Sequence, residues 1–328
     1  MIAHRVRALP AARCGPSLVR ERRLPRRWTY PGAVTVLDRA TWQRLATEHE
    51  ARTDSLTAAH RERRVQGRSH PVADFLFVYY NNPPSRLRRW HPGPHIILAE
   101  AADEPIAMWR HFRTDPDGSV ALDLDAFVEA RGSTVRFVRE LLSRTLSRPA
   151  LTGCFGLHEW AMVYGVDQDE VRHERWPLRL GSDGTDEVVR SHQLRCTHFD
   201  AVRFFTPQAI PLNAVQPTRD EQLDLEQPGC LHAGMDVYKW AFKLAPAVPG
   251  DLVLDAFELA AEIRVLDMRA SPYDLRDLGL EPIAIETPEG KRHYAQAQRK
   301  FTARANGLRH RLLAVCDRIL SGAGARQL

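Results

Sequence analysis

CLHAGMDVYKWAFKL, at residues 230–244, predicts a helix that ends before Pro246. Residues three, four and seven positions apart on a helix share a face, so one face carries His232, Asp236, Lys239 and Lys243. The adjoining stripe is apolar and consists of Leu231, Met235, Tyr238 and Phe242. A histidine, a carboxylate and two lysines beside a buried surface suit the edge of a pocket. The alternative is that Asp236 pairs with one of the lysines on a solvated face.

Most other segments repeat the helical pattern. We expect helices over residues 36–66, 124–147, 157–163, 252–268 and 294–320. A short strand is expected at 95–99 and a hairpin at 109–113 and 119–122. GSDGT, at 181–185, is expected to be a Gly-rich loop, without the spacing of a phosphate-binding loop. The predicted fold class is therefore mainly α with a few short β-strands, in a compact helical globular fold.

The chain is expected to divide into three parts. Residues 1–35 form a basic arm, interpreted either as disordered or as the product of a start codon assigned too far upstream. Residues 36–320 form a single globular catalytic domain, and residues 321–328 form a disordered tail.

Composition and charge limit the classes of function. Hydrophobic residues make up 44% and charged residues 27% of the 328 residues, and no apolar run approaches the roughly 20 residues that span a bilayer. Five cysteines without a secretory signal favour a reducing compartment, so we expect a cytoplasmic protein with no membrane partner. The net charge is +5, but residues 1–32 carry eight arginines and one glutamate, so the remainder sums to −2. DNA binding would therefore need a local basic patch.

Three short blocks combine a cysteine, a histidine and a carboxylate. They are CFGLHE at 154–159, CTHFD at 196–200 and CLHAGMD at 230–236. These side chains bind metals and transfer protons, which makes the following residues candidate catalytic groups: His158, Glu159, His198, Asp200, His232 and Asp236. None of the blocks has the spacing of a strong metal motif, so a bound metal stays undecided. The cysteines could equally be small buried hydrophobic residues.

Glu159 lies in an apolar stretch, where burying a carboxylate is costly unless it is paired or protonated. It is either a site residue or a buried glutamate paired with an arginine. His198 and Asp200 share a face if their segment is a strand, and diverge by about 200 degrees if it is a helix.

A second candidate region combines aromatic and basic residues. Tyr79 and Tyr80 precede Arg88, Arg89 and Trp90, and such a set can contact phosphates and stack on an extruded base. The alternative is an Arg-rich turn with a tryptophan in the core.

Several stretches carry a resemblance to a known family. They are HPVADFLFVYY at 70–80, RRWHPG at 88–93, GCFGLHEW at 153–160, LRCTHFD at 194–200, GCLH at 229–232, DVYKW at 236–240 and DMRASPYDL at 267–275. On these stretches the chain resembles the bacterial family named 3-methyladenine DNA glycosylase, from about residue 36 to about residue 315. The helix-hairpin-helix pattern with a following catalytic aspartate, found in the best-known alkylbase glycosylases, is absent from the sequence.

The resemblance implies a hydrolase that removes alkylated purines such as 3-methyladenine from double-stranded DNA, without a cofactor or an obligate protein partner. Asp236 or Glu159 would then supply the carboxylate, and His232, His158 or His198 would position water. Lys239, Arg88 and Arg89 would meet phosphates, while Trp90 or Tyr238 would stack on the base.

Two other classes of function stay open. The first is a metal-dependent enzyme that acts on a small molecule through the His and carboxylate residues, with a divalent metal as its cofactor. The near-neutral charge after residue 32 favours this class over the glycosylase. The second is a non-catalytic helical binding protein in which the three blocks form polar networks in the core.

Overall fold

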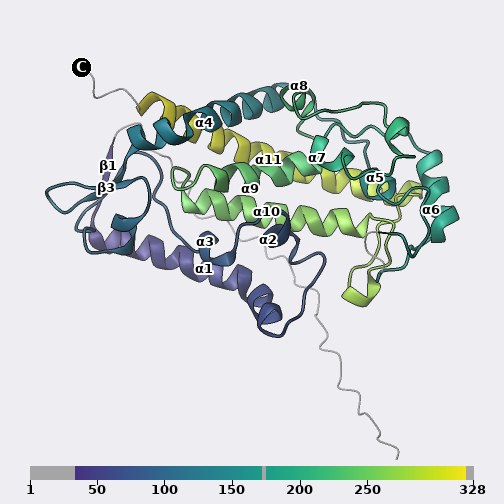
Figure 1. Cartoon of the computed structure of the whole chain (residues 1–328), viewed down its shortest axis with the longest axis horizontal. Helices are drawn as coiled ribbons and strands as arrows, with labels where there is room; N and C mark the ends of the chain where they lie inside the picture. Colours follow the sequence, from purple (N-terminus) through teal and green to yellow (C-terminus); the bar gives the residue numbers. More distant parts are fainter. Residues whose placement is uncertain (1–33, 172–174, 323–328) are drawn as a thin grey trace, which may run out of the picture.

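The computed structural model describes residues 34–171 and 175–322. Four long helices form its body: α4 (Leu124–Ser147), α9 (Leu231–Lys243), α10 (Gly250–Arg269) and α11 (Pro288–Gly322). Helix α9 packs on α10, and α11 packs on α4, α9 and α10. In Figure 1 these four helices run side by side along the long axis of the molecule. The predicted mainly α fold with a few short strands is confirmed.

Helix α10 lies at the centre because its sequence is apolar on most of its circumference, and such a helix is stable only when it is covered on several sides. Its fully covered side chains include Leu252, Leu254, Ala260 and Ile263. Two charged residues of this helix, Arg264 and Asp267, are buried as well. A buried charge requires a partner, so these two positions indicate where the polar interior begins.

A small sheet lies at one end of the molecule (Figure 1). Its strands are β1 (Thr35–Leu37), β2 (Ile96–Leu98), β3 (Phe112–Thr114) and β4 (Val120–Leu122), in the order β1-β2-β4-β3. Strand β1 is parallel to β2, with Thr35 opposite Ile96, while β4 is antiparallel to both β2 and β3. The strand expected at 95–99 and the hairpin expected at 109–113 and 119–122 are therefore confirmed.

Helix α1 (Arg39–Val65) follows strand β1 and packs on α10, so it connects the sheet to the four-helix body. Asp38 caps it by accepting a hydrogen bond from the Thr41 amide at 2.7 Å. Arg52 of α1 pairs with Asp255 and Glu258 of α10 at 2.7 and 2.9 Å. The helix expected over 36–66 is present from Arg39, while Val36 and Leu37, expected to begin it, belong to strand β1. Part of the polar surface of α1 contacts α10.

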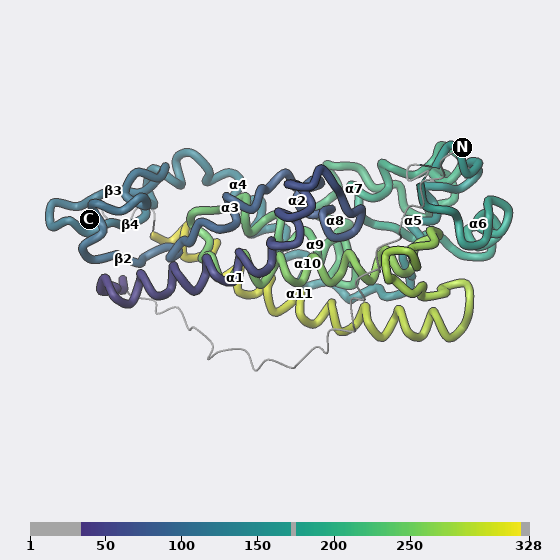
Figure 2. The backbone as a smooth tube through the Cα atoms, turned by 90° about the horizontal axis from the view of Figure 1, so that it is seen from below, coloured from purple at the N-terminus to yellow at the C-terminus, as the bar shows by residue number. Residues whose placement is uncertain are grey.

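The opposite end consists of short helices and loops. Figure 2 shows α5 and α6 far from the sheet. The short elements are α2 (Phe75–Tyr79), α3 (Pro84–Leu87), α5 (Leu157–Ala161), α6 (Gly181–Arg190), α7 (Phe199–Val202), α8 (Gln222–Leu225) and the 3-10 turns η1 (Pro105–Met108), η2 (Ile210–Leu212) and η3 (Arg276–Leu278). Of these, η1 packs on β3 at the sheet end and α3 packs on α1 and α10, whereas α2, α5 and α7 lie beside the end of α9 that carries His232 and Asp236.

The expectation of a loop at 181–185 is wrong, because GSDGT forms the first half of helix α6. Thr185, Val188 and Val189 are spaced to bury one face of that helix. The Thr185 hydroxyl also donates a hydrogen bond to the Gly181 carbonyl at 2.7 Å. Packing of the amphipathic face therefore outweighs the low helix propensity of the two glycines.

The other expected boundaries fall close to the observed ones, and 124–147 coincides with α4. Helix α11 begins earlier than expected, at Pro288, a residue type suited to a first helical turn. Most of the expected arm at 1–35 and tail at 321–328 lies outside the described residues. Within the described ranges, no helix combines the length and the apolar character that crossing a bilayer requires.

Candidate functional site

A pocket of about 810 Å³ opens beside α2, α5, α7 and α9. Aromatic side chains form much of its wall: Phe75, Tyr79, Tyr80, Phe204, Phe242 and Tyr273. Basic side chains also line it: Arg175, Arg203, Lys239, Lys243 and Arg264. The acidic lining residues are Asp74, Glu159 and Asp200. Aromatic and cationic groups around one space suit a flat ligand that carries negative charge nearby.

One polar cluster lies where α9 meets α7 and the end of α2. Asp236 is only 1% exposed. Tyr80 donates a hydrogen bond to its Oδ1 at 2.9 Å, and His198 Nε2 lies 3.3 Å from its Oδ2. The ammonium group of Lys239 contacts the same Oδ2 and lies 3.4 Å from Asp200 Oδ2. The alternative of a carboxylate paired with a lysine describes Asp236, although the pair is buried rather than solvated.

The charge states of this cluster follow from its contacts. Burial opposes ionisation of Asp236, but the charge of Lys239 and the hydrogen bond from His198 outweigh it, so the pKa of the carboxyl lies well below its usual range. Burial likewise opposes the charge of Lys239, yet Asp236 raises the pKa of the ammonium to about 12. At neutral pH the cluster therefore holds a carboxylate and an ammonium, and Lys239 is a poor nucleophile.

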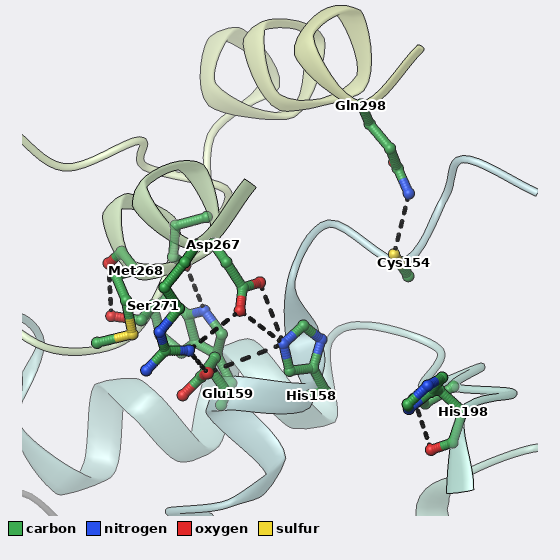
Figure 3. A network of polar contacts seen from close by, with 12 residues as sticks. Cys154, His158, Glu159, His198, Asp267, Met268, Ser271 and Gln298 are labelled. Carbon is green, nitrogen blue, oxygen red and sulfur yellow. Dashed lines mark hydrogen bonds and ion pairs between the residues drawn. The ribbon is translucent and has the colours of Figure 1, made fainter. Parts of the chain in front are cut away.

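A second polar cluster joins α5 to the end of α10. His158 Nε2 lies 3.1 Å from Asp267 Oδ1, and Arg264 Nη1 donates to Glu159 Oε1 at 2.8 Å. Arg264 Nη1 is also 3.4 Å from Asp267 Oδ2. Figure 3 shows the side chains of His158 and Asp267 pointing toward each other, with Glu159 beside them. Burial opposes the charge of His158, but Asp267 outweighs it and raises the pKa of the imidazole.

His232 connects the two clusters. Its ring centroid lies 4.4 Å from that of His158 and 5.2 Å from that of His198. Burial and the neighbouring histidines lower the pKa of His232 well below its usual value, so this imidazole is neutral at pH 7. It also lines the pocket. The structure thus brings the histidines of all three sequence blocks into one continuous array beside a cavity.

Within the described residues, two groups have the ligand atoms for a metal ion. One is His158, His232 and Asp267, and the other is His198, Glu226 and Asp236. In each group the ligand atoms lie within 4.8 Å of one another. Imidazole and carboxylate donors of this kind suit divalent transition metals.

The cysteines of the three blocks are not activated. Burial raises the pKa of Cys154 and Cys230, and raises that of Cys196 to about 12. A thiol is nucleophilic as its thiolate, so none of the three suits covalent catalysis at neutral pH. All three side chains are half-buried; Cys154 Sγ accepts a hydrogen bond from Gln298 at 3.3 Å, and Cys196 Sγ lies 3.9 Å from the His198 carbonyl oxygen.

The structure separates some predicted site residues from the pocket lining. Arg88 pairs with Glu50 and Asp54 of α1, and the guanidinium of Arg89 lies 5.5 Å from the ring centroid of Trp109. Trp90 packs against the apolar cluster at the sheet end. Tyr238 is fully buried and accepts a hydrogen bond from Asn82 at 2.8 Å. The alternative of an Arg-rich turn with a core tryptophan describes residues 88–90, and their contact with phosphates stays a prediction.

Sequence reasoning did not select Arg264, Asp267 or Glu226, which complete the two clusters. The available signal was a pair of charges three residues apart inside the apolar helix expected at 252–268. Glu226 carried no comparable signal, because it precedes Gln227 and Pro228 in a loop-like stretch.

Asp74, on the rim of the pocket, gives a prediction about pH. It binds the Arg63 guanidinium, His60 Nδ1 at 2.8 Å and the His70 amide at 2.8 Å. Burial opposes ionisation, but these partners lower its pKa to about 2. Because the folded pKa lies below the unfolded value of about 3.9, the stabilisation is complete above pH 4 and is lost as the pH falls toward 2.

Asp74→Asn should therefore lower the free energy of unfolding by about 1.5–3 kcal/mol at pH 7. The difference in the free energy of unfolding between this variant and the parent chain should narrow between pH 4 and pH 2. Urea unfolding at a series of pH values measures both effects, with the exposed Asp277→Asn as the control. A gap that is constant with pH would show that the carboxylate charge is not what stabilises this contact.

Comparison with known proteins adds no assignment, since no family model, no curated protein and no solved structure matches the chain.

Proposed function

We propose that the chain is a hydrolase that binds an alkylated purine base of DNA in the pocket and cleaves its N-glycosidic bond. The observation that carries the proposal is the lining of the pocket, which combines aromatic with basic side chains. A flipped base stacks on aromatic rings, and its flanking phosphates need positive charge. The resemblance of the sequence to the 3-methyladenine DNA glycosylase family supports the same reaction.

The chemistry of the substrate suits this lining. A purine alkylated on a ring nitrogen carries positive charge while it is joined to the sugar, and a cation is attracted to the face of an aromatic ring. Phe75 and Tyr79 already stack, with ring centroids 4.9 Å apart. Two of the basic lining groups, Arg203 and Lys243, would then meet phosphates. The volume of about 810 Å³ admits a base together with its sugar.

Asp200 is the pocket carboxylate best placed to act on the sugar. Its side chain is 24% exposed and lines the pocket, with Arg203 and Lys239 each 3.4 Å away, whereas Asp236 and Glu159 are buried. A carboxylate at this place would stabilise the positively charged sugar of the transition state or activate water. Asp236 would act indirectly, by fixing Lys239 beside Asp200.

Water is the nucleophile in this proposal. An amine attacks the sugar only when it is unprotonated, and the raised pKa of Lys239 keeps that amine charged. The neutral imidazole of His232 lines the same space and can accept a hydrogen bond from a water molecule.

Release of methylated bases from alkylated duplex DNA by the purified chain tests the proposal. We expect release by the parent chain, and a loss of about 100-fold in Asp200→Asn. Asp103→Asn, an exposed aspartate near the sheet, is the matched control and should keep full activity. No release at a large excess of enzyme would refute the glycosylase function. Full release by Asp200→Asn would refute the role given to Asp200.

A metal-dependent enzyme acting on a small molecule is the second candidate. The group His158, His232 and Asp267 beside the pocket favours it, as does the near-neutral charge outside residues 1–32. Base release that persists after chelation would favour the first candidate. A chain that binds DNA no better at low salt than at high salt would favour the second.

A further inference from the structure

One carboxylate oxygen beside the three histidines is buried without a hydrogen bond. Asp267 is 1% exposed, and its Oδ1 has no hydrogen-bond partner among the described residues. His158 Nε2 lies 3.1 Å from that oxygen, but the hydrogen bond from His158 goes to Oδ2, at 3.2 Å. Folded proteins rarely leave a buried carboxylate oxygen unpaired, because the loss of hydration is not recovered. Apart from this ion-pair contact with His158, Oδ1 therefore has lone pairs that no described side chain uses, and a bound cation would occupy them.

We propose that His158, His232 and Asp267 bind one divalent transition-metal ion, such as Zn²⁺ or Fe²⁺. Two imidazoles and one carboxylate form a donor set that such ions accept, with three protein ligands and at least one open position. The ligand atoms lie within 4.8 Å of one another. Atoms bound to one ion at ligand distances of about 2.1 Å are at most roughly 4.2 Å apart, so a small inward rotation of the side chains completes the site.

His232 is the residue that makes the site reachable. Within the described residues it has no hydrogen bond that would have to break, and it lines the pocket. An ion held by its imidazole would thus have its open position toward the cavity, where water or a substrate can enter. This geometry distinguishes the proposed site from a closed structural metal site.

Arg264 does not occupy the place of the ion. Its guanidinium lies closest to Glu159, at 2.8 Å, and reaches Asp267 only at 3.4 Å and only through Oδ2. Oδ1 stays directed toward His158. Arg264 can therefore keep its pair with Glu159 while Asp267 binds a metal, as a neighbouring group that orients the ligand.

The other group already contains a cation. In the set His198, Glu226 and Asp236, the ammonium of Lys239 contacts Asp236 Oδ2, and Tyr80 donates to Oδ1. A divalent ion there would have to displace a buried ammonium. The two sets thus have different roles, and only the His158 set is proposed to take a metal.

This inference does not rest on the proposed glycosylase function, which requires no metal, and its test measures binding rather than base release. The full chain, without an affinity tag and freed of metal by a chelator, is titrated with Co²⁺ under visible absorption and with Zn²⁺ in a calorimeter. We expect one equivalent to bind and to produce the absorption bands of a Co²⁺ ion with nitrogen ligands.

His232→Ala should weaken binding by about 100-fold or more, because loss of a direct ligand costs at least as much as loss of a residue that orients one. His293→Ala is the matched control, an exposed histidine outside the array, and should bind as the parent does. His158→Gln provides a second test if His232→Ala does not fold, as judged by circular dichroism. No binding by the parent, or unchanged binding in a folded His232→Ala or His158→Gln variant, would overturn the assignment.

Discussion

Lys239→Met is expected to lower the free energy of unfolding by about 3–5 kcal/mol, because it leaves a buried charge without its partner. Asp236 is 1% exposed and ionised, and Lys239 is the cation in contact with it. The remaining neighbours are the Tyr80 hydroxyl, which donates a hydrogen bond, and His198, whose Nε2 lies 3.3 Å from the carboxylate. Urea unfolding followed by circular dichroism measures the loss.

Lys243→Met is the control for this prediction. Lys243 lies one turn further along the same helix and is exposed, so its loss should change stability by no more than about 0.5 kcal/mol. The double variant Asp236→Asn with Lys239→Met should recover much of the loss, because it leaves no charge buried. Similar small losses in Lys239→Met and Lys243→Met would mean that water reaches Asp236 and that the cluster is not a dry pair.

The pH dependence gives an independent check of the same pair. The folded pKa of Asp236 lies below its unfolded value of about 3.9, so its stabilisation is present above that pH and is lost as the pH falls. The difference in the free energy of unfolding between the parent and Lys239→Met should therefore become smaller as the pH falls. The contribution of Lys239, whose pKa is raised to about 12, should be lost only in strong alkali.

The helix at 230–244 and its polar face could be predicted because both depend on local spacing. A period of 3.6 residues places His232, Asp236 and Lys239 on one side whatever surrounds the helix. The partners that define the chemistry could not be predicted. Tyr80 is 156 positions away from Asp236 and His198 is 38 positions away, and only the packing of the helices brings them into contact.

Glu159 is a second residue whose partner could not be predicted. Its apolar surroundings indicated that the carboxylate needs a partner, but the sequence contains many arginines and does not identify which one pairs with it. The structure selects Arg264, 105 positions away on a helix that is otherwise apolar. For GSDGT at 181–185, local reasoning was misleading, because two glycines suggested a loop where a buried face formed a helix.

Arg264→Met is expected to cost about 3–5 kcal/mol as well, since it removes the cation beside two buried carboxylates, Glu159 and Asp267. Part of the packing should survive, because the guanidinium lies 4.0 Å from the ring centroid of Phe75 and a methionine can cover the same ring. Arg304→Met is the control: its pair with Glu262 is about half exposed on each side and should contribute no more than about 1 kcal/mol. Equal losses in the two variants would contradict a dry, charged interior at this end of α10.

Added Zn²⁺ gives a stability test of the His158 set. An ion bound to His158, His232 and Asp267 stabilises every variant that keeps these three ligands, the parent chain included, and the gain grows with the logarithm of free Zn²⁺. In Arg264→Met the ion should also replace part of the charge that Arg264 supplies to Asp267, so Zn²⁺ should narrow the difference in unfolding free energy between this variant and the parent. The double variant His232→Ala with Arg264→Met lacks one ligand and should gain no such stability. Equal gains in the single and the double variant would place the ion elsewhere than on the His158 set.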